Sequence, residues 1–232
     1  MKTLIFPDDI DYQQSGYPPL RDDKIVESKA NNFITSPGIN DYFERSELEN
    51  PLQGYKKLSK VEEDLFDKIS SFSNIEDISD EELINIFHTI QMWGAWEGRY
   101  IYFRDGGFEK NFDIETYRTL VSRCLNLEKH RLLDWVNTVS KWTFECNEGI
   151  NIFKTSFSTK HVRFWLYNKL KDDTLPIFDS IIQNGFNKIQ GNSLNNYKVE
   201  HLEFYWKQMI EKSKKEDITL KQLERLLFNY WS

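Results

Sequence analysis

The positions of apolar residues from Ser59 onward predict a helical protein. Apolar side chains recur there at spacings of three and four residues, the period of an amphipathic helix. Helices are expected after Ser59, Ser79 and Asp113, over about 128–145, and over 179–189, 194–214 and 219–230. Three of them begin with the capping-box spacing, in the pairs Ser59–Glu62, Ser79–Glu82 and Thr219–Gln222. No segment alternates as a sheet strand does, so we expect an all-α fold.

The first 57 residues lack this periodicity and contain five of the six prolines. They are expected to form an extended N-terminal arm, 1–57, packed on a helical domain, 58–232. The chain's 17 Phe, 11 Tyr and 7 Trp are too many for a disordered protein.

Composition favours a cytoplasmic protein. No apolar run reaches the roughly 18 to 20 residues that a membrane span needs, and the short apolar start is followed at once by acidic residues. Only Cys124 and Cys146 are present, so neither a disulfide framework nor a cysteine-bound cluster is expected. The sequence therefore indicates no membrane, metal or cofactor.

Charge is unevenly distributed along the chain. The net charge is −7, but residues 1–100 hold 10 basic and 20 acidic residues, whereas 150–215 hold 11 basic and 6 acidic ones. Such asymmetry is typical of a localised basic face, although two ordinary solvated surfaces would leave the same pattern.

The segment KTSFSTKHVRFW, residues 154–165, combines hydroxyl and basic side chains at a predicted helix start. Ser158 or Thr159 can cap a helix that runs to about Leu170. Its free amides, with hydroxyls close by, form a seat for a phosphate. Lys160 is then expected in the first turn, where the helix dipole disfavours its ammonium form, as an amine nucleophile requires. The simpler interpretation is a solvated lysine behind an ordinary serine cap.

Asp179 follows Lys160 by nineteen residues, in LPIFDS. A helix over 160–170 is about 16 Å long, and the eight residues 171–178 can span about 26 Å. The connection can therefore run back along the helix and bring Asp179 to the end where Lys160 lies. Alternatively, Asp179 is only the cap of the next helix.

These motifs resemble the lysine–aspartate core of the helix-hairpin-helix DNA glycosylases, in particular the bacterial 8-oxoguanine DNA glycosylase-like branch. Lys160 matches the family's lysine, which opens the second hairpin helix, and Asp179 matches its aspartate. IQMWGAWEGR, residues 90–99, and LKQLERLLFNYW, residues 220–231, are similar to two further segments of that branch. The resemblance covers roughly 84–231 and implies a hairpin motif at about 145–180.

The resemblance implies excision of an oxidised or otherwise modified base from DNA by a monomer without cofactor. Lys160 and Asp179 would be catalytic, and strand nicking by β-elimination would follow if Lys160 forms a Schiff base with the sugar. The residues expected to bind DNA are Lys154, Thr155, Ser156, Ser158, Thr159, His161 and Arg163. Those expected in the base pocket are Gln91, Trp93, Trp96 and Phe157. Repair of oxidised guanine and defence against modified phage DNA both fit the resemblance.

The chain departs from the family at the hairpin, where Ser156-Phe157-Ser158 replaces a Gly-Val-Gly-like turn. The turn must therefore use other backbone dihedrals. Two alternatives stay open: a non-catalytic helical module that binds nucleic acid or protein, and a nuclease with acidic clusters at Asp8-Asp9 or Asp22-Asp23.

Overall fold

Helices are the only regular secondary structure in the part of the chain that the structure describes. The computed structural model describes residues 3–13, 50–52, 54–94, 107–128, 132–150, 155–190 and 194–231, and these ranges contain no strand. This agrees with the expected all-α class. The α-helices are α3 (Leu58–Ser70), α4 (Asp80–Gly94), α5 (Gly107–Asn111), α6 (Ile114–Leu125), α7 (Leu132–Gly149), α8 (Thr155–Leu170), α9 (Ser180–Gln190), α10 (Val199–Glu216) and α11 (Leu220–Trp231). Two short 3-10 helices, η1 (Ile75–Asp77) and η2 (Lys171–Asp173), precede α4 and follow α8.

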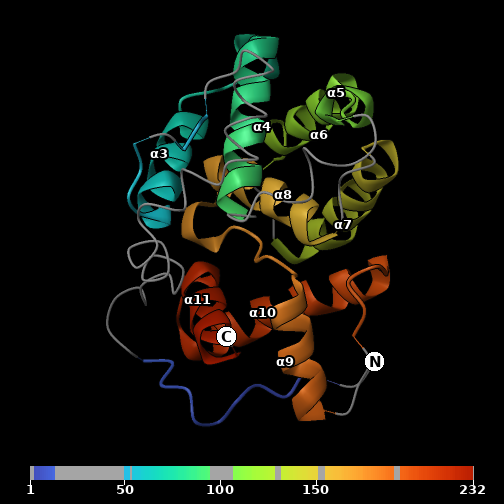
Figure 1. Cartoon of the computed structure of the whole chain (residues 1–232). Coiled ribbons are helices and arrows are strands. Elements are labelled where there is room, and N and C mark those ends of the chain that lie inside the picture. The colour runs from blue at the N-terminus through green and yellow to red at the C-terminus, as the bar shows by residue number, and fades with distance from the viewer. Residues whose placement is uncertain are drawn as a thin grey trace.

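Helix α8 is the centre of the larger group of helices. It packs against α3, α4, α6 and α7, which surround it in the upper part of Figure 1. Val162, Phe164, Trp165 and Leu166 are completely buried, so α8 is enclosed on several faces instead of showing one apolar stripe. The helix that contains Lys160 is therefore held rigidly by its neighbours.

Helices α9, α10 and α11 lie below this group in the view of Figure 1. Helix α11 packs against both α9 and α10, and α10 packs against α7, which joins the two groups. Residues 3–13 run beside α9, α10 and α11 without helical structure. Most of the predicted arm lies outside the described residues, so its extent stays a prediction.

Several predicted caps are confirmed. Asp113 accepts hydrogen bonds from the amides of Glu115 and Thr116 at the start of α6. The hydroxyls of Ser79 and Thr219 accept from the amides three residues on, at 3.2 Å each.

The predicted Ser59–Glu62 capping box is wrong. Helix α3 begins at Leu58, after Lys57, and its N-cap makes no side-chain hydrogen bond. The Glu62 carboxylate is instead buried among basic side chains in the interior. The apolar stripe predicted for this helix, Val61, Leu65, Phe66 and Ile69, is buried as expected.

Both cysteines are buried thiols without a disulfide. Burial raises the pKa of Cys124 to about 12 and also raises that of Cys146. Among the described helices, none combines the length and apolar character required to cross a membrane.

Candidate functional site

Helix α8 begins earlier than its hydroxyl residues predict. Its first residue is Thr155, and the hydroxyls of Ser158 and Thr159 donate to the carbonyls of Thr155 and Ser156, at 3.1 and 3.2 Å. Neither residue is the cap. Lys160 is consequently the sixth residue of the helix and lies in its second turn. Lys160 therefore does not lie in the first turn, where the helix dipole was expected to disfavour its ammonium form.

Most side chains predicted to bind phosphate lie in the interior. Five of the seven are at most 1% exposed: Thr155, Ser158, Thr159, His161 and Arg163. A buried side chain cannot contact a phosphate on the surface, so the prediction is corrected for these five. Ser156 is partly exposed and remains a candidate, and Lys154 lies outside the described residues.

Arg163 belongs to a buried group of charges that we call the ionic cluster: Glu62, Arg163, Lys221, Glu224 and Arg225. Its guanidinium lies 2.7 Å from a Glu62 oxygen and 2.9 Å from a Glu224 oxygen. Arg225 and Lys221 contact the other Glu62 oxygen. The cluster thereby ties α8 to α3 and α11.

The two carboxyl groups of the ionic cluster differ in electrostatic balance. Burial opposes ionisation of Glu62, but Arg163, Arg225 and Lys221 outweigh it and lower the pKa of this carboxyl. For Glu224 burial prevails and raises the pKa, although Arg163 and the amide of Ile177 act in the other direction. Sequence analysis did not identify this cluster. The sequence feature that points to the cluster is the position of Glu62 and Glu224, each next to a residue of an apolar stripe, Val61 and Leu223.

The connection after α8 returns along the helix. The Thr174 hydroxyl donates to the carbonyl of Arg163 at 2.6 Å, and the amide of Phe178 donates to the Thr159 hydroxyl at 3.2 Å. Thus a later residue of the connection lies beside an earlier residue of α8. This confirms the expected direction of the connection.

Side chains of other helices hold the connection between these two points. Trp206 donates to the carbonyl of Pro176 at 2.7 Å, and Tyr205 donates to that of Ile177 at 3.0 Å. The carboxylate of Glu224 accepts from the amide of Ile177. Since each of these groups is buried, the extended segment has partners without belonging to a sheet.

Asp179 follows this segment and caps α9. Its Oδ1 accepts from the amide of Ile182 at 3.0 Å, as the sequence predicted. Lys160 directly follows Thr159, and Asp179 directly follows Phe178, so both immediately succeed a hydrogen-bonded pair. Both residues are partly exposed. The candidate site is therefore the place where the α8 backbone at Lys160 meets the start of α9.

Phe157 lies next to Lys160. The Lys160 Nζ is 4.7 Å from the centre of the Phe157 ring, a distance at which the ring face attracts a cation. Phe157 is partly buried against the core. An aromatic side chain predicted for the base pocket thus contacts the candidate nucleophile.

The remaining pocket candidates have different environments. Gln91 is 1% exposed, and neither its Nε2 nor its Oε1 has a hydrogen-bond partner among the described residues. The Trp93 indole donates to the Leu58 carbonyl at 3.1 Å and packs edge-on against Phe164. Because these contacts fix Trp93 between helices, we remove it from the pocket. Trp96 lies outside the described residues.

His161 takes part in a buried chain of polar side chains. The Trp165 indole donates to the Tyr117 hydroxyl at 2.9 Å, and that hydroxyl lies 2.7 Å from His161 Nδ1. The indole can only donate, so the Tyr117 hydroxyl accepts from it, and the donor between this hydroxyl and Nδ1 depends on the imidazole tautomer. Burial, assisted by the charge of Lys160, lowers the pKa of His161 well below its usual value. His161 is therefore neutral and structural.

The described residues contain no group of three or more His, Cys, Asp or Glu arranged to hold a metal ion. Comparisons of the chain with protein-family models, with curated proteins and with solved structures find no match. The functional argument therefore rests on the residues around Lys160 and Asp179.

Proposed function

We propose that the protein is a DNA glycosylase that uses Lys160 and Asp179 to excise a modified base. The observation that carries this proposal is the return of the connection along α8, fixed by the hydrogen bond from Phe178 to Thr159. Lys160 and Asp179, both partly exposed, each directly follow one member of this hydrogen-bonded pair. An amine beside a carboxylate suits cleavage of a bond that leaves a cationic sugar.

In the proposed reaction the target nucleotide first rotates out of the base stack. The bond between sugar C1′ and the base nitrogen then breaks, and the base leaves with the bonding electrons and takes up a proton. The Asp179 carboxylate stabilises the positive charge that develops on the sugar. The Lys160 amine, once deprotonated, attacks C1′ and forms a C–N bond.

The second stage depends on which nucleophile reaches C1′. Attack by Lys160 opens the sugar to a Schiff base, and β-elimination of the 3′ phosphate then nicks the strand. Attack by a water that Asp179 activates leaves an intact strand with an abasic site. The Phe157 ring stabilises the ammonium form of Lys160 in the free protein, so the first route requires that this proton is lost when substrate binds.

Phe157 is the residue that we assign to the flipped base. An aromatic ring can stack on any base. Gln91 is 1% exposed, so its carboxamide cannot contact a base edge, and it is removed from the pocket for the same reason as the buried phosphate candidates.

The test is incubation with duplexes that contain oxidised, alkylated or phage-type bases, followed by detection of abasic sites. Borohydride should trap a covalent complex with the wild-type protein if Lys160 is the nucleophile. Lys160→Gln should abolish trapping, and Asp179→Asn should abolish base release. Lys169→Gln, a substitution in the last turn of the same helix, is the matched control and should retain both.

Three results would contradict the proposal in different ways. Base release by Asp179→Asn at the wild-type rate would remove the role of this carboxylate. Absence of abasic product from every duplex would favour the non-catalytic binding module. Strand cleavage that requires a divalent metal would favour the nuclease.

A further inference from the structure

The hydroxyl of Thr159 links the two halves of the candidate site. Thr159 immediately precedes Lys160. Its hydroxyl accepts a hydrogen bond from the amide of Phe178, the residue immediately before Asp179. The side chain is completely buried, so it cannot touch DNA. Any influence on the reaction must act through the positions of Lys160 and Asp179.

The orientation of this hydroxyl is fixed. It donates its own hydrogen to the carbonyl of Ser156 at 3.2 Å, which directs a lone pair elsewhere. That lone pair accepts a hydrogen bond from the amide nitrogen of Phe178, which lies 3.2 Å from the hydroxyl oxygen. The hydroxyl is therefore a bridge between the first turn of α8 and the end of the connection. A side chain without an acceptor would leave a buried amide unpaired.

The same amide lies directly before the cap of α9. Asp179 Oδ1 accepts from the amide of Ile182, so one end of the carboxylate is set by the first turn of α9. A further constraint on Asp179 is the backbone at Phe178, whose ring is stacked on Tyr205 with centroids 4.6 Å apart. Release of the Phe178 amide would let Asp179 and the start of α9 shift relative to Lys160.

We propose that Thr159 is a positioning residue that sets the placement of Asp179 against Lys160. This inference rests on the proposed glycosylase function and assigns a role to a hydroxyl that the sequence had suggested for phosphate binding. A displacement of about 1 Å in such a pair can lower a rate by about a hundredfold.

The experiment compares base release under single-turnover conditions for five proteins: wild type, three Thr159 variants and one control variant. Thr159→Val keeps the shape of the side chain but removes the acceptor, and the release rate should fall by about tenfold to a hundredfold. DNA affinity should stay within about twofold, the scatter of a neutral substitution. Thr159→Ser restores the acceptor and should restore most of the rate. Thr159→Ala tests the same loss without the bulk of valine.

Thr174→Val is the matched control. It removes another buried threonine hydroxyl from the same connection, the one that donates to the Arg163 carbonyl. Melting temperatures of all variants show how much stability each substitution removes. Thr174→Val should lower the melting temperature but leave the release rate close to that of wild type.

The outcomes separate the two proposals. A wild-type protein that releases no base overturns the glycosylase function and the role of Thr159 with it. An active wild type combined with wild-type rates for Thr159→Val and Thr159→Ala overturns the positioning role alone. Equal rate losses in Thr174→Val and Thr159→Val also overturn it, because they indicate general loosening of the connection.

Discussion

At the residue scale, the ionic cluster shows how burial changes the role of a charge. Arg163 is completely enclosed and lies against the rings of Phe66 and Trp93 as well as against two carboxylates. Transfer of these charges out of water is costly, so the cluster as a whole is not a large source of stability. Removal of one partner is a different matter, since it leaves a buried carboxylate with fewer counter-charges.

Arg163→Met should therefore destabilise the protein by about 3–5 kcal/mol, the cost of breaking a buried ion pair from one side. Chemical denaturation measures this loss. Arg123→Met is the matched control, because Arg123 pairs with Glu145 on the surface, where both side chains are at least 39% exposed. Exposed pairs contribute only about 0–1 kcal/mol, so the control should change little. Equal losses in the two variants would contradict the distinction.

His88 should make stability depend on pH. Burial lowers the pKa of this imidazole from 6.5 to about 3, whereas the unfolded chain binds a proton near 6.5. Between these two pH values the unfolded state takes up a proton that the folded state does not. The contribution of His88 to the free energy of unfolding is therefore fully present above about pH 6.5 and decreases as the pH is lowered. From pH 7 to pH 5 the loss due to His88 is about 2 kcal/mol.

His88→Gln tests this because the glutamine does not titrate. Its free energy of unfolding should fall less steeply between pH 7 and pH 5 than that of wild type. The buried His161 contributes in the same direction, so some slope remains. Identical slopes for both proteins would show that His88 binds its proton equally in the folded and unfolded states, so that burial does not lower its pKa.

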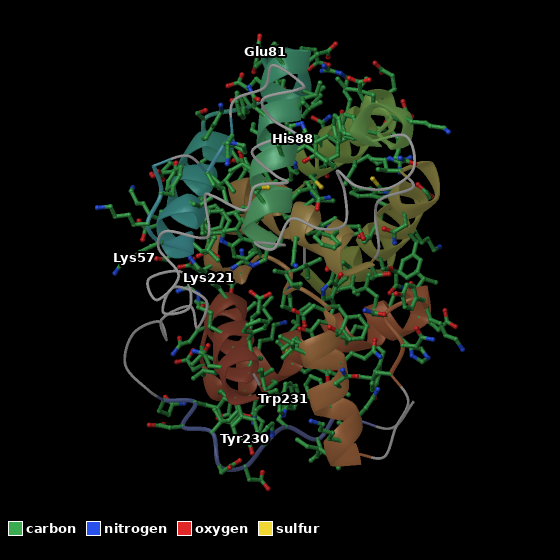
Figure 2. The ribbon with its side chains drawn as sticks, viewed as in Figure 1. Lys57, Glu81, His88, Lys221, Tyr230 and Trp231 are labelled. Atoms are coloured by element: carbon green, nitrogen blue, oxygen red, sulfur yellow. The ribbon has the colours of Figure 1, made fainter. Side chains whose placement is uncertain are left out.

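At the element scale, the contact between α9 and α11 depends on a glycine. A Cβ on Gly185 would lie 2.1 Å from Trp231 Cδ2, far inside van der Waals contact. Figure 2 shows Trp231 and Tyr230 at the end of α11, close to the N-terminal segment. A glycine within a helix normally weakens it, so its presence here reflects the close approach of the indole.

Gly185→Ala should consequently lower stability by about 1–3 kcal/mol, because overpacking outweighs the gain in helix propensity. Asn184→Ala, at the neighbouring exposed position of α9, gains propensity without a clash and should be neutral or slightly stabilising. Thermal unfolding of the two variants gives the comparison. A stabilised Gly185→Ala protein would mean that the indole can move aside at little cost.

Sequence patterns predicted which segments are helical better than they predicted the residue at which each helix begins. Apolar periodicity depends on which face is buried, and this is fixed over many residues, as in α3 and α6. The start of α8 was misplaced because serine and threonine favour caps but can also donate to a carbonyl three residues back. Ser158 and Thr159 do the latter. Local sequence does not distinguish these two options.

In the candidate site, too, some features can be predicted from the sequence and others cannot. Chain lengths permit Asp179 to approach the end of α8 where Lys160 lies but do not require it, and the contact between Phe178 and Thr159 agrees with that approach. The surroundings of the pair do not follow from local sequence. Whether Arg163 faces a phosphate or a buried glutamate depends on α3 and α11, which lie far away in the chain. Such contacts are set by tertiary packing.

At the scale of the whole molecule, the N-terminal segment joins the helices that follow Asp179. The amide of Leu4 donates to Gln208 on α10 at 2.9 Å, and the hydroxyl of Tyr230 on α11 donates to Asp9 at 3.0 Å. Phe6 packs edge-on against Phe186 of α9, with centroids 5.3 Å apart. Residues from opposite ends of the chain therefore stabilise one group of helices.

Phe186 should make the two chain ends energetically dependent on each other. It contacts Phe6 on one side and Trp231, 4.5 Å away between centroids, on the other. If both contacts hold Phe186 in place, loss of either one loosens the other. Phe6→Ala and Trp231→Ala should then be non-additive in the free energy of unfolding, with a coupling of at least about 0.5 kcal/mol.

A double-mutant cycle measures this coupling by chemical denaturation of the two single variants, the double variant and wild type. The control cycle combines Phe6→Ala with Trp142→Ala, since Trp142 lies on α7 against Arg123 and shares no contact with Phe186 among the described residues. That cycle should be additive within about 0.5 kcal/mol. Additivity in both cycles would mean that the N-terminal segment and the end of α11 stabilise α9 independently. Coupling confined to the first cycle would mean that the helix capped by Asp179 is held by both chain ends together.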